Sequence, residues 1–233
     1  MKKLLVALLI VALIPQLAFG GWTFSAKAES AGAVTTAVTV DDLVIVWWLS
    51  PVNDTTTTAH FCDDDSGGSN TYNYIDTIQS DRPARISVSW MKAKATNAIL
   101  TITPYTTSGC STGVTTEHIH VARFTNSGGA NYALDTNAKT ISTCSQALTT
   151  GVANTLLLAA TEASGAVTQT TMTEIYQHAS TARMTTAYDV SSNSAGSNTV
   201  AMSCPTPRGI IGVAMKETTG AGGTTIRHRV TGQ

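Results

Sequence analysis

Alternation of hydrophobic and polar residues along most of the chain predicts β-strands. After Ala28 the two kinds of side chain alternate with a period of two, and the spacing of an amphipathic helix does not recur. Clusters of Gly, Ser and Asn between these stretches are typical of turns. The many short strands favour an all-β, jelly-roll-like antiparallel β-sandwich. They are predicted at 35–40, 42–49, 71–78, 84–93, 98–104, 117–124, 154–161, 170–177, 182–190, 197–204 and 209–216, with a last one near 224–230.

Three of the predicted strands are apolar on both faces, at 43–49, 156–160 and 210–215. A sandwich strand ordinarily buries one face only, so something must cover the second face. One explanation is a crossing loop or the N-terminal segment. The other is a neighbouring subunit. The candidate residues of such an assembly surface are Trp47, Trp48, Ile210 and Ile211.

The N-terminus has the pattern of an export signal. Two lysines precede an apolar run at 4–14, and Pro15 follows it. Cleavage is plausible before Gly21 or, with a better small-x-small motif, before Glu29. An uncleaved membrane anchor is the alternative, because residues 4–26 carry no charge and are long enough to span a bilayer.

These patterns divide the chain into two parts. We expect residues 1–28 to be a signal peptide or anchor in the form of a hydrophobic helix, and residues 29–233 to form a single β-sandwich domain. The softest internal boundary is at 142–153, between two strand-rich halves. An exported chain of this kind is expected to be extracellular, on a cell surface or in a virion.

Composition supports the all-β prediction and excludes some functions. The 233 residues include 40 Thr, a β-branched residue that favours strands. Charged residues make up only 12% of the chain, and the formal net charge is −1. Proteins that bind nucleic acid normally have a basic surface, so no nucleic-acid partner is expected.

The four cysteines predict two disulfide bonds in an exported chain. Their number is even, and no Cys-x-x-Cys spacing suggests a metal site. Four cysteines allow three pairings. The favoured pairing is Cys110 with Cys144 and Cys62 with Cys204, because the first pair brackets a local excursion.

Few residues suggest chemistry, and no catalytic motif is present, so an enzyme is not expected. His118 and His120 lie on the same face of a predicted strand and could share a metal, with Glu117 opposite. A third ligand is not evident, so we favour solvent-facing histidines with Ile119 and Val121 in the core.

Two further groups suggest a ligand. Asp63 and Asp65 are weak candidates for calcium, although a solvated turn is the preferred interpretation. The tryptophans at positions 22, 47, 48 and 90 could stack on sugars, but core packing is the simpler interpretation. No metal or other cofactor is therefore expected.

Four stretches occur in an order that resembles a known group of proteins. They are Val40–Trp48, Asp65–Tyr72, Ser89–Ala93, and an ending that runs from Ala187-Tyr188-Asp189 through Ser194-Ala195-Gly196 to Gly209–Lys216. Together they resemble jelly-roll, concanavalin-like sandwich modules of phage virion and tail proteins and of exported bacterial surface proteins. The resemblance covers roughly residues 35–217 and carries no catalytic residues.

The resemblance implies a role in virion structure, surface assembly or glycan contact. We therefore expect a non-enzymatic, extracytoplasmic structural subunit that assembles with copies of itself into a filament, fibre or virion. Residues 29–34, or the chain end from Thr224, could add a strand to a neighbour's open edge. The alternative is a carbohydrate-binding adhesin that binds surface glycans.

Overall fold

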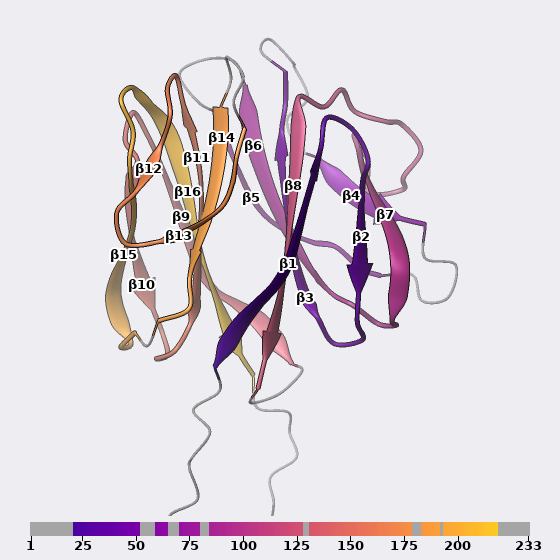
Figure 1. The fold of residues 1–233 in the computed structure, drawn as a ribbon, viewed down its shortest axis with the longest axis horizontal. Helices are drawn as coiled ribbons and strands as arrows, with labels where there is room; N and C mark the ends of the chain where they lie inside the picture. The colour runs from indigo at the N-terminus through magenta and orange to yellow at the C-terminus, as the bar shows by residue number, and fades with distance from the viewer. Residues whose placement is uncertain are drawn as a thin grey trace, which may run out of the picture.

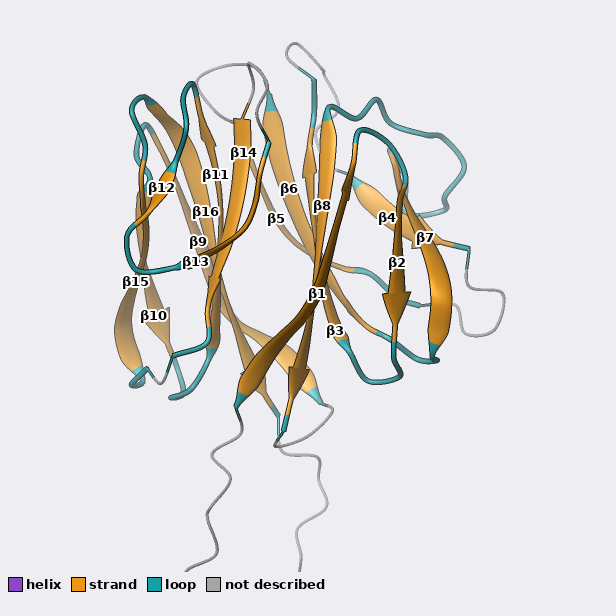
Figure 2. Cartoon of the chain, viewed as in Figure 1, coloured by secondary structure: helices purple, strands orange, loops and turns teal. Residues whose placement is uncertain are grey.

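The computed structural model describes residues 21–51, 59–64, 70–79, 84–127, 131–178, 183–191 and 193–218. The regular structure in these residues is all β-strand, and the named strands pair antiparallel (Figure 2). The all-β prediction is therefore confirmed. No helix among these residues could span a membrane. Most of the predicted hydrophobic helix and the predicted strand at 224–230 lie outside the described residues.

Eight strands in the first half of the chain form two sheets. The five-stranded sheet has the order β1-β8-β3-β6-β5, and the three-stranded sheet has the order β2-β7-β4. The bounds are β1 (Trp22–Ser30), β2 (Val34–Val38), β3 (Leu43–Leu49), β4 (His60–Asp63), β5 (Asn73–Gln79), β6 (Arg85–Lys92), β7 (Asn97–Tyr105) and β8 (His118–Asn126).

Eight strands in the second half repeat this arrangement. Their five-stranded sheet has the order β9-β16-β11-β14-β13, and their three-stranded sheet has the order β10-β15-β12. The bounds are β9 (Tyr132–Ile141), β10 (Ser145–Thr150), β11 (Leu156–Ala163), β12 (Thr168–Gln169), β13 (Thr173–Gln177), β14 (Arg183–Asp189), β15 (Gly196–Ser203) and β16 (Pro207–Glu217).

The two halves therefore share one topology. Adding eight to every label in the first half gives the strand order of the second half. The change from one half to the other falls between β8 and β9, not at the predicted 142–153 segment, which contains β10. The sequence analysis did not detect this repeat.

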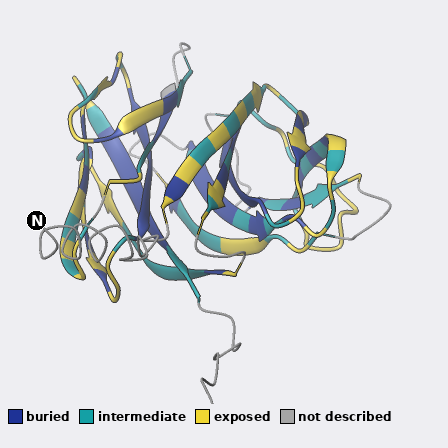
Figure 3. Cartoon of the chain, turned by 60° about the horizontal axis from the view of Figure 1, so that its bottom comes forward, coloured by how far each residue is buried: buried dark blue, intermediate teal, exposed yellow. Residues whose placement is uncertain are grey.

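The four sheets are stacked as layers in a sandwich-like arrangement (Figure 1). The two five-stranded sheets face each other across a central core that both halves supply. Each three-stranded sheet covers the outer face of its own five-stranded sheet, and a separate apolar cluster fills each of these outer interfaces. Exposed residues lie on outer strands and turns (Figure 3).

This layering explains the strands that are apolar on both faces. One face of β3, β11 and β16 contacts the central core, and the other contacts an outer core. Trp47, Trp48, Ile210 and Ile211 are all 0% exposed. The prediction that these four residues form an assembly surface is therefore wrong for the folded chain. The cover is the chain's own sheets, neither a crossing loop nor a subunit.

The first strand begins earlier than the sequence analysis expected. Residues 22–28, which were assigned to the leader, belong to β1 and pair with β8. Cleavage before Glu29 would remove most of β1, whereas cleavage before Gly21 would leave it complete. The predicted donor segment 29–34 is also occupied, since Glu29 and Ser30 pair with β8 and Val34 pairs with β7.

Both predicted disulfide bonds are present, but with a different pairing. Cys62 is bonded to Cys110 and Cys144 to Cys204, with Cα atoms 6.2 and 6.3 Å apart. Each bond therefore lies within one half of the chain. The predicted pairing joined the two halves, because the repeated strand order was not recognised from the sequence.

Candidate metal centre

β-bulges at matching places make it possible to compare the two five-stranded sheets residue by residue. The first and fifth strands of each sheet carry a bulge, in β1 and β9 and in β5 and β13. When these bulges are aligned, each row of paired residues in one sheet has an equivalent row in the other. One such row contains Glu29, His120 and Trp47 in the first sheet and Lys139, Ile211 and Ala160 in the second.

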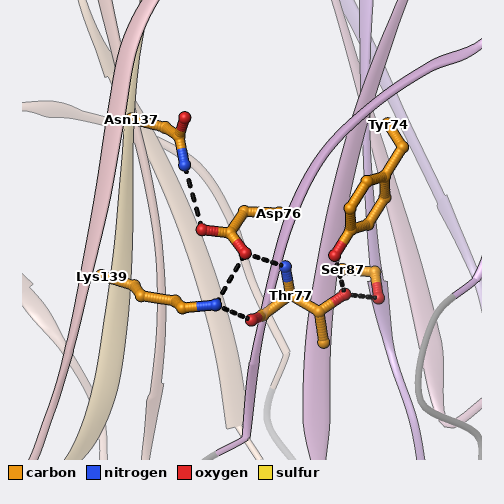
Figure 4. A network of polar contacts seen from close by, with 6 residues as sticks. All are labelled: Tyr74, Asp76, Thr77, Ser87, Asn137 and Lys139. Carbon is orange, nitrogen blue, oxygen red and sulfur yellow. Dashed lines mark hydrogen bonds and ion pairs between the residues drawn. The ribbon is translucent and has the colours of Figure 1, made fainter.

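The first strand of each half contacts the fifth strand of the other half, so the layered core has two equivalent edges. At the β5–β9 edge, the Asp76 carboxylate accepts hydrogen bonds from Asn137 and Lys139 at 3.0 and 2.7 Å (Figure 4). The Lys139 ammonium also donates to the Thr77 carbonyl at 2.7 Å. Ile211 is fully buried beside them. This edge is closed by one ion pair over apolar packing.

The β1–β13 edge is different, because histidines take the equivalent positions. His118 and His120 on β8 are 7% and 0% exposed. Their Nε2 atoms lie 3.0 and 3.7 Å from the same oxygen, Oε2 of Glu29 on β1. The ring of His178, just after β13, stacks on His118 with centroids 3.7 Å apart.

A hydrogen bond from the facing sheet holds His120 in place. Its Nδ1 lies 3.1 Å from the hydroxyl of Thr186 on β14. Lys27 lies on β1 two residues before Glu29, and its ammonium donates to the Ile175 carbonyl and sits over the Tyr176 ring. The imidazole rings are therefore held by contacts from both halves of the chain, and the Lys27 ammonium points to β13.

Electrostatics at this edge favour neutral imidazoles. Burial, together with His118, His178 and Lys27, holds the pKa of His120 well below its ordinary value of 6.5. Burial and His118 also lower the pKa of His178, against smaller opposing effects of nearby carboxylates. Neutral imidazole is the form that binds metals, because its ring nitrogen has a free lone pair.

Among the residues that the structure describes, Glu29, His118 and His120 form a group that could hold a metal. Each offers one ligand atom, and these atoms lie within 4.8 Å of one another. Imidazole nitrogen with one carboxylate oxygen suits zinc and other late transition metals. Glu29 keeps 40% of its side chain exposed, so the group is open to solvent on one side.

Two of these residues, His118 and His120, were predicted from the sequence, and the third was not. Ile119 and Val121 are buried as predicted, but the prediction of solvent-facing histidines is wrong. The carboxylate of the group is Glu29, not Glu117. Glu29 is far away in sequence, and only the register of β1 on β8 places it opposite His120.

The other predicted site residues do not join this group. Asp63 accepts hydrogen bonds from Asn70 and Tyr72, both at 2.9 Å, while Asp65 lies outside the described residues. Trp22, Trp47 and Trp48 are buried, and Trp90 is partly exposed. No protein-family model, curated protein or solved structure matches the chain.

Acidification is expected to destabilise the metal-free chain. His120 and His178 have lowered pKa values in the fold, so below about pH 6.5 the unfolded chain binds protons that the folded chain does not. The unfolding free energy should therefore fall by up to about 1.4 kcal/mol per pH unit per histidine. The charged or ionisable side chains that face these two rings are Lys27, Glu29, Glu117 and His118.

Urea unfolding with chelator at pH 7.5, 6.5 and 5.5 measures this effect. The variant His120→Gln should reduce the pH dependence to the part that comes from His178. The control His60→Gln, on β4 in the three-stranded sheet of the first half, should leave the dependence unchanged. Equal stability of the unsubstituted chain at the three pH values would contradict the expectation.

Proposed function

We propose that the chain is an exported, non-enzymatic structural subunit built from two tandem jelly rolls, which assembles with copies of itself into a surface filament, fibre or virion. The observation that carries this proposal is the repeated strand order. In each half the first, eighth, third and sixth strands lie side by side, and the second, seventh and fourth strands cover them. Eight-stranded jelly rolls made of two sheets serve as viral capsid and lectin domains, and each half here has eight strands in two sheets.

The disulfide bonds support the proposed extracytoplasmic location. Two disulfide bonds are typical of proteins in an oxidising, extracytoplasmic environment. The N-terminal pattern of lysines and apolar residues supports export, and cleavage before Gly21 would release a chain that begins next to β1.

The outer surface, not the core strands, is where subunits would meet. Ile99 on β7 is 67% exposed and Ile141 at the end of β9 is 56% exposed, so both can contact a neighbour. Few charges oppose such contacts, because only 12% of the residues are charged.

Electron microscopy and light scattering of the disulfide-bonded chain at increasing concentration test the proposal. We expect ordered polymers, which Ile99→Lys or Ile141→Lys should weaken while leaving the thermal unfolding midpoint unchanged. Ser145→Lys, at an exposed position of β10, is the matched control. A chain that stays monomeric at every concentration would overturn the proposal.

A carbohydrate-binding adhesin remains the second candidate, because a groove of about 460 Å³ lies beside β4. Its lining includes Phe61, Asp63, Asn70, Tyr72 and Tyr74, a mixture of aromatic and polar groups suited to sugars. A glycan array probed with the chain and with Tyr74→Ala distinguishes this function. Binding that the variant loses would favour it, and an array without signal would exclude it for the glycans present.

A further inference from the structure

The two edges of the central core show that packing does not require the histidines. At the β5–β9 edge, the positions equivalent to His118, His120 and His178 hold Gly209, Ile211 and Ile78. Ile78 approaches Gly209 so closely that a Cβ there would lie 2.9 Å from its Cδ1 atom. The stacked pair His118–His178 occupies the place of this apolar contact. The same backbone thus closes one edge with apolar side chains and the other with imidazoles.

Buried imidazoles cost stability unless their nitrogens have partners. Among the described residues, Nε2 of His120 and Nδ1 of His118 have no hydrogen-bond partner. His120 is fully buried, and its Nε2 lies 3.7 Å from Glu29 Oε2, too far for a hydrogen bond. When Nδ1 of His120 donates to Thr186, the lone pair of Nε2 is directed at a carboxylate oxygen, which also carries lone pairs.

A cation between Nε2 of His120 and the Glu29 carboxylate gives each of these two atoms a partner. We propose that Glu29, His118 and His120 bind one Zn²⁺ ion at the β1–β13 edge. Tetrahedral zinc with bonds of about 2.0–2.2 Å places its ligand atoms about 3.3–3.6 Å apart. The Glu29 oxygen lies 3.0 and 3.7 Å from the two imidazole nitrogens, on either side of this range.

Thr186 and His178 hold the two histidine ligands in place. With Nε2 of His120 bound to the ion, its Nδ1 carries the proton and donates it to the Thr186 hydroxyl 3.1 Å away, an arrangement common for outer partners of zinc histidines. His178 covers one face of the His118 ring. Both come from the second half, whereas all three ligands come from the first. Zinc would therefore link β1 to β8 within a site that is complete only when the two halves pack together.

The fourth zinc position faces solvent at Glu29, where water would complete the tetrahedron. Zinc bound by two imidazoles, one carboxylate and a water has the ligand set of hydrolytic zinc sites. The proposal here is limited to binding and does not depend on self-assembly.

Isothermal titration of the full chain with ZnCl₂ tests the proposal. The chain should carry no polyhistidine tag, should be stripped with chelator, and should be dialysed at pH 7.5. We expect one Zn²⁺ per chain with micromolar or tighter affinity and a higher unfolding midpoint in zinc. Co²⁺ should give the intense visible bands of a four-coordinate site, and Mg²⁺ should not compete.

Matched variants locate the ion. Glu29→Gln and His118→Gln should each weaken zinc binding at least tenfold, and Thr186→Val about tenfold, which is the lower end of effects at outer partners. Glu174→Gln, an exposed carboxylate on β13, and His60→Gln are the controls and should bind as the unsubstituted chain does. Circular dichroism in chelator checks that each variant folds, and Glu29→Gln is the safest because Glu29 is partly exposed. Absence of zinc binding, or equal affinity of Glu29→Gln and the unsubstituted chain, would overturn the proposal.

Discussion

Replacing Glu162 with glutamine is expected to destabilise the fold by about 3–5 kcal/mol, because the change leaves a buried arginine without its counter-charge. Glu162 on β11 is 0% exposed, and its Oε1 atom lies 3.1 Å from a guanidinium nitrogen of Arg208 on β16. The Arg208 side chain is only 7% exposed, so water cannot replace the lost carboxylate. Urea unfolding monitored by circular dichroism measures the difference.

The double variant Glu162→Leu with Arg208→Met separates the ion pair from its individual charges. Removing both partners of a buried pair is often neutral, since no charge is then left unpaired. We expect the double variant to be more stable than Glu162→Gln. Glu174→Gln changes an exposed carboxylate and should alter stability by less than about 0.5 kcal/mol. A cost of Glu162→Gln as small as that of Glu174→Gln would contradict the expectation.

Much of the strand pattern could be predicted from sequence because burial imposes a period of two. The predicted strands at 42–49, 84–93 and 197–204 lie within one residue at each end of β3, β6 and β15. The first strand was missed for a different reason. Its Trp22 and Phe24 continue the uncharged stretch of the N-terminus, so the pattern assigned them to the leader.

Two strands of the second half, β9 and β10, were not predicted from the sequence because few of their side chains are buried. In β9 the side chains are mostly half-buried or exposed, and in β10 only Leu148 and Thr150 are buried. A weakly buried strand has no clear contrast between its two faces. The hydrophobic pattern therefore could not distinguish these strands from polar loops.

The candidate metal centre depends on information that local sequence does not contain. His118 and His120 were recognised by their i, i+2 spacing, which places both on one strand face. Glu29 joins them only because β1 pairs with β8, and Thr186 only because the sheets of the two halves face each other. Repeat detection would have helped, but equivalent positions such as His120 and Ile211 share burial rather than chemistry.

Trp47→Ala is expected to lower the free energy of unfolding by about 3–5 kcal/mol, because Trp47 fills the central core. Trp47 lies in the middle of β3, is 0% exposed, and contributes to the core that the two five-stranded sheets share. Its removal leaves a cavity between the two halves that neither sheet can fill without moving. Urea unfolding measures the loss of stability. At urea concentrations above the unfolding midpoint, this variant should not assemble.

The neighbouring Trp48 supplies an internal comparison, because it points into the outer core of the first half. The Trp48 indole donates a hydrogen bond to the Thr116 hydroxyl at 3.1 Å, whereas the Trp47 indole nitrogen has no partner among the described residues. Changing each to phenylalanine removes similar volume. Trp48→Phe should therefore cost about 1 kcal/mol more than Trp47→Phe, the typical value of one hydrogen bond. In a chain whose Trp22 and Trp90 are replaced with phenylalanine, acrylamide should quench neither remaining indole before unfolding, since both are fully buried. Efficient quenching in that folded chain, or a larger cost for Trp47→Phe, would mean that the two tryptophans do not occupy these two cores.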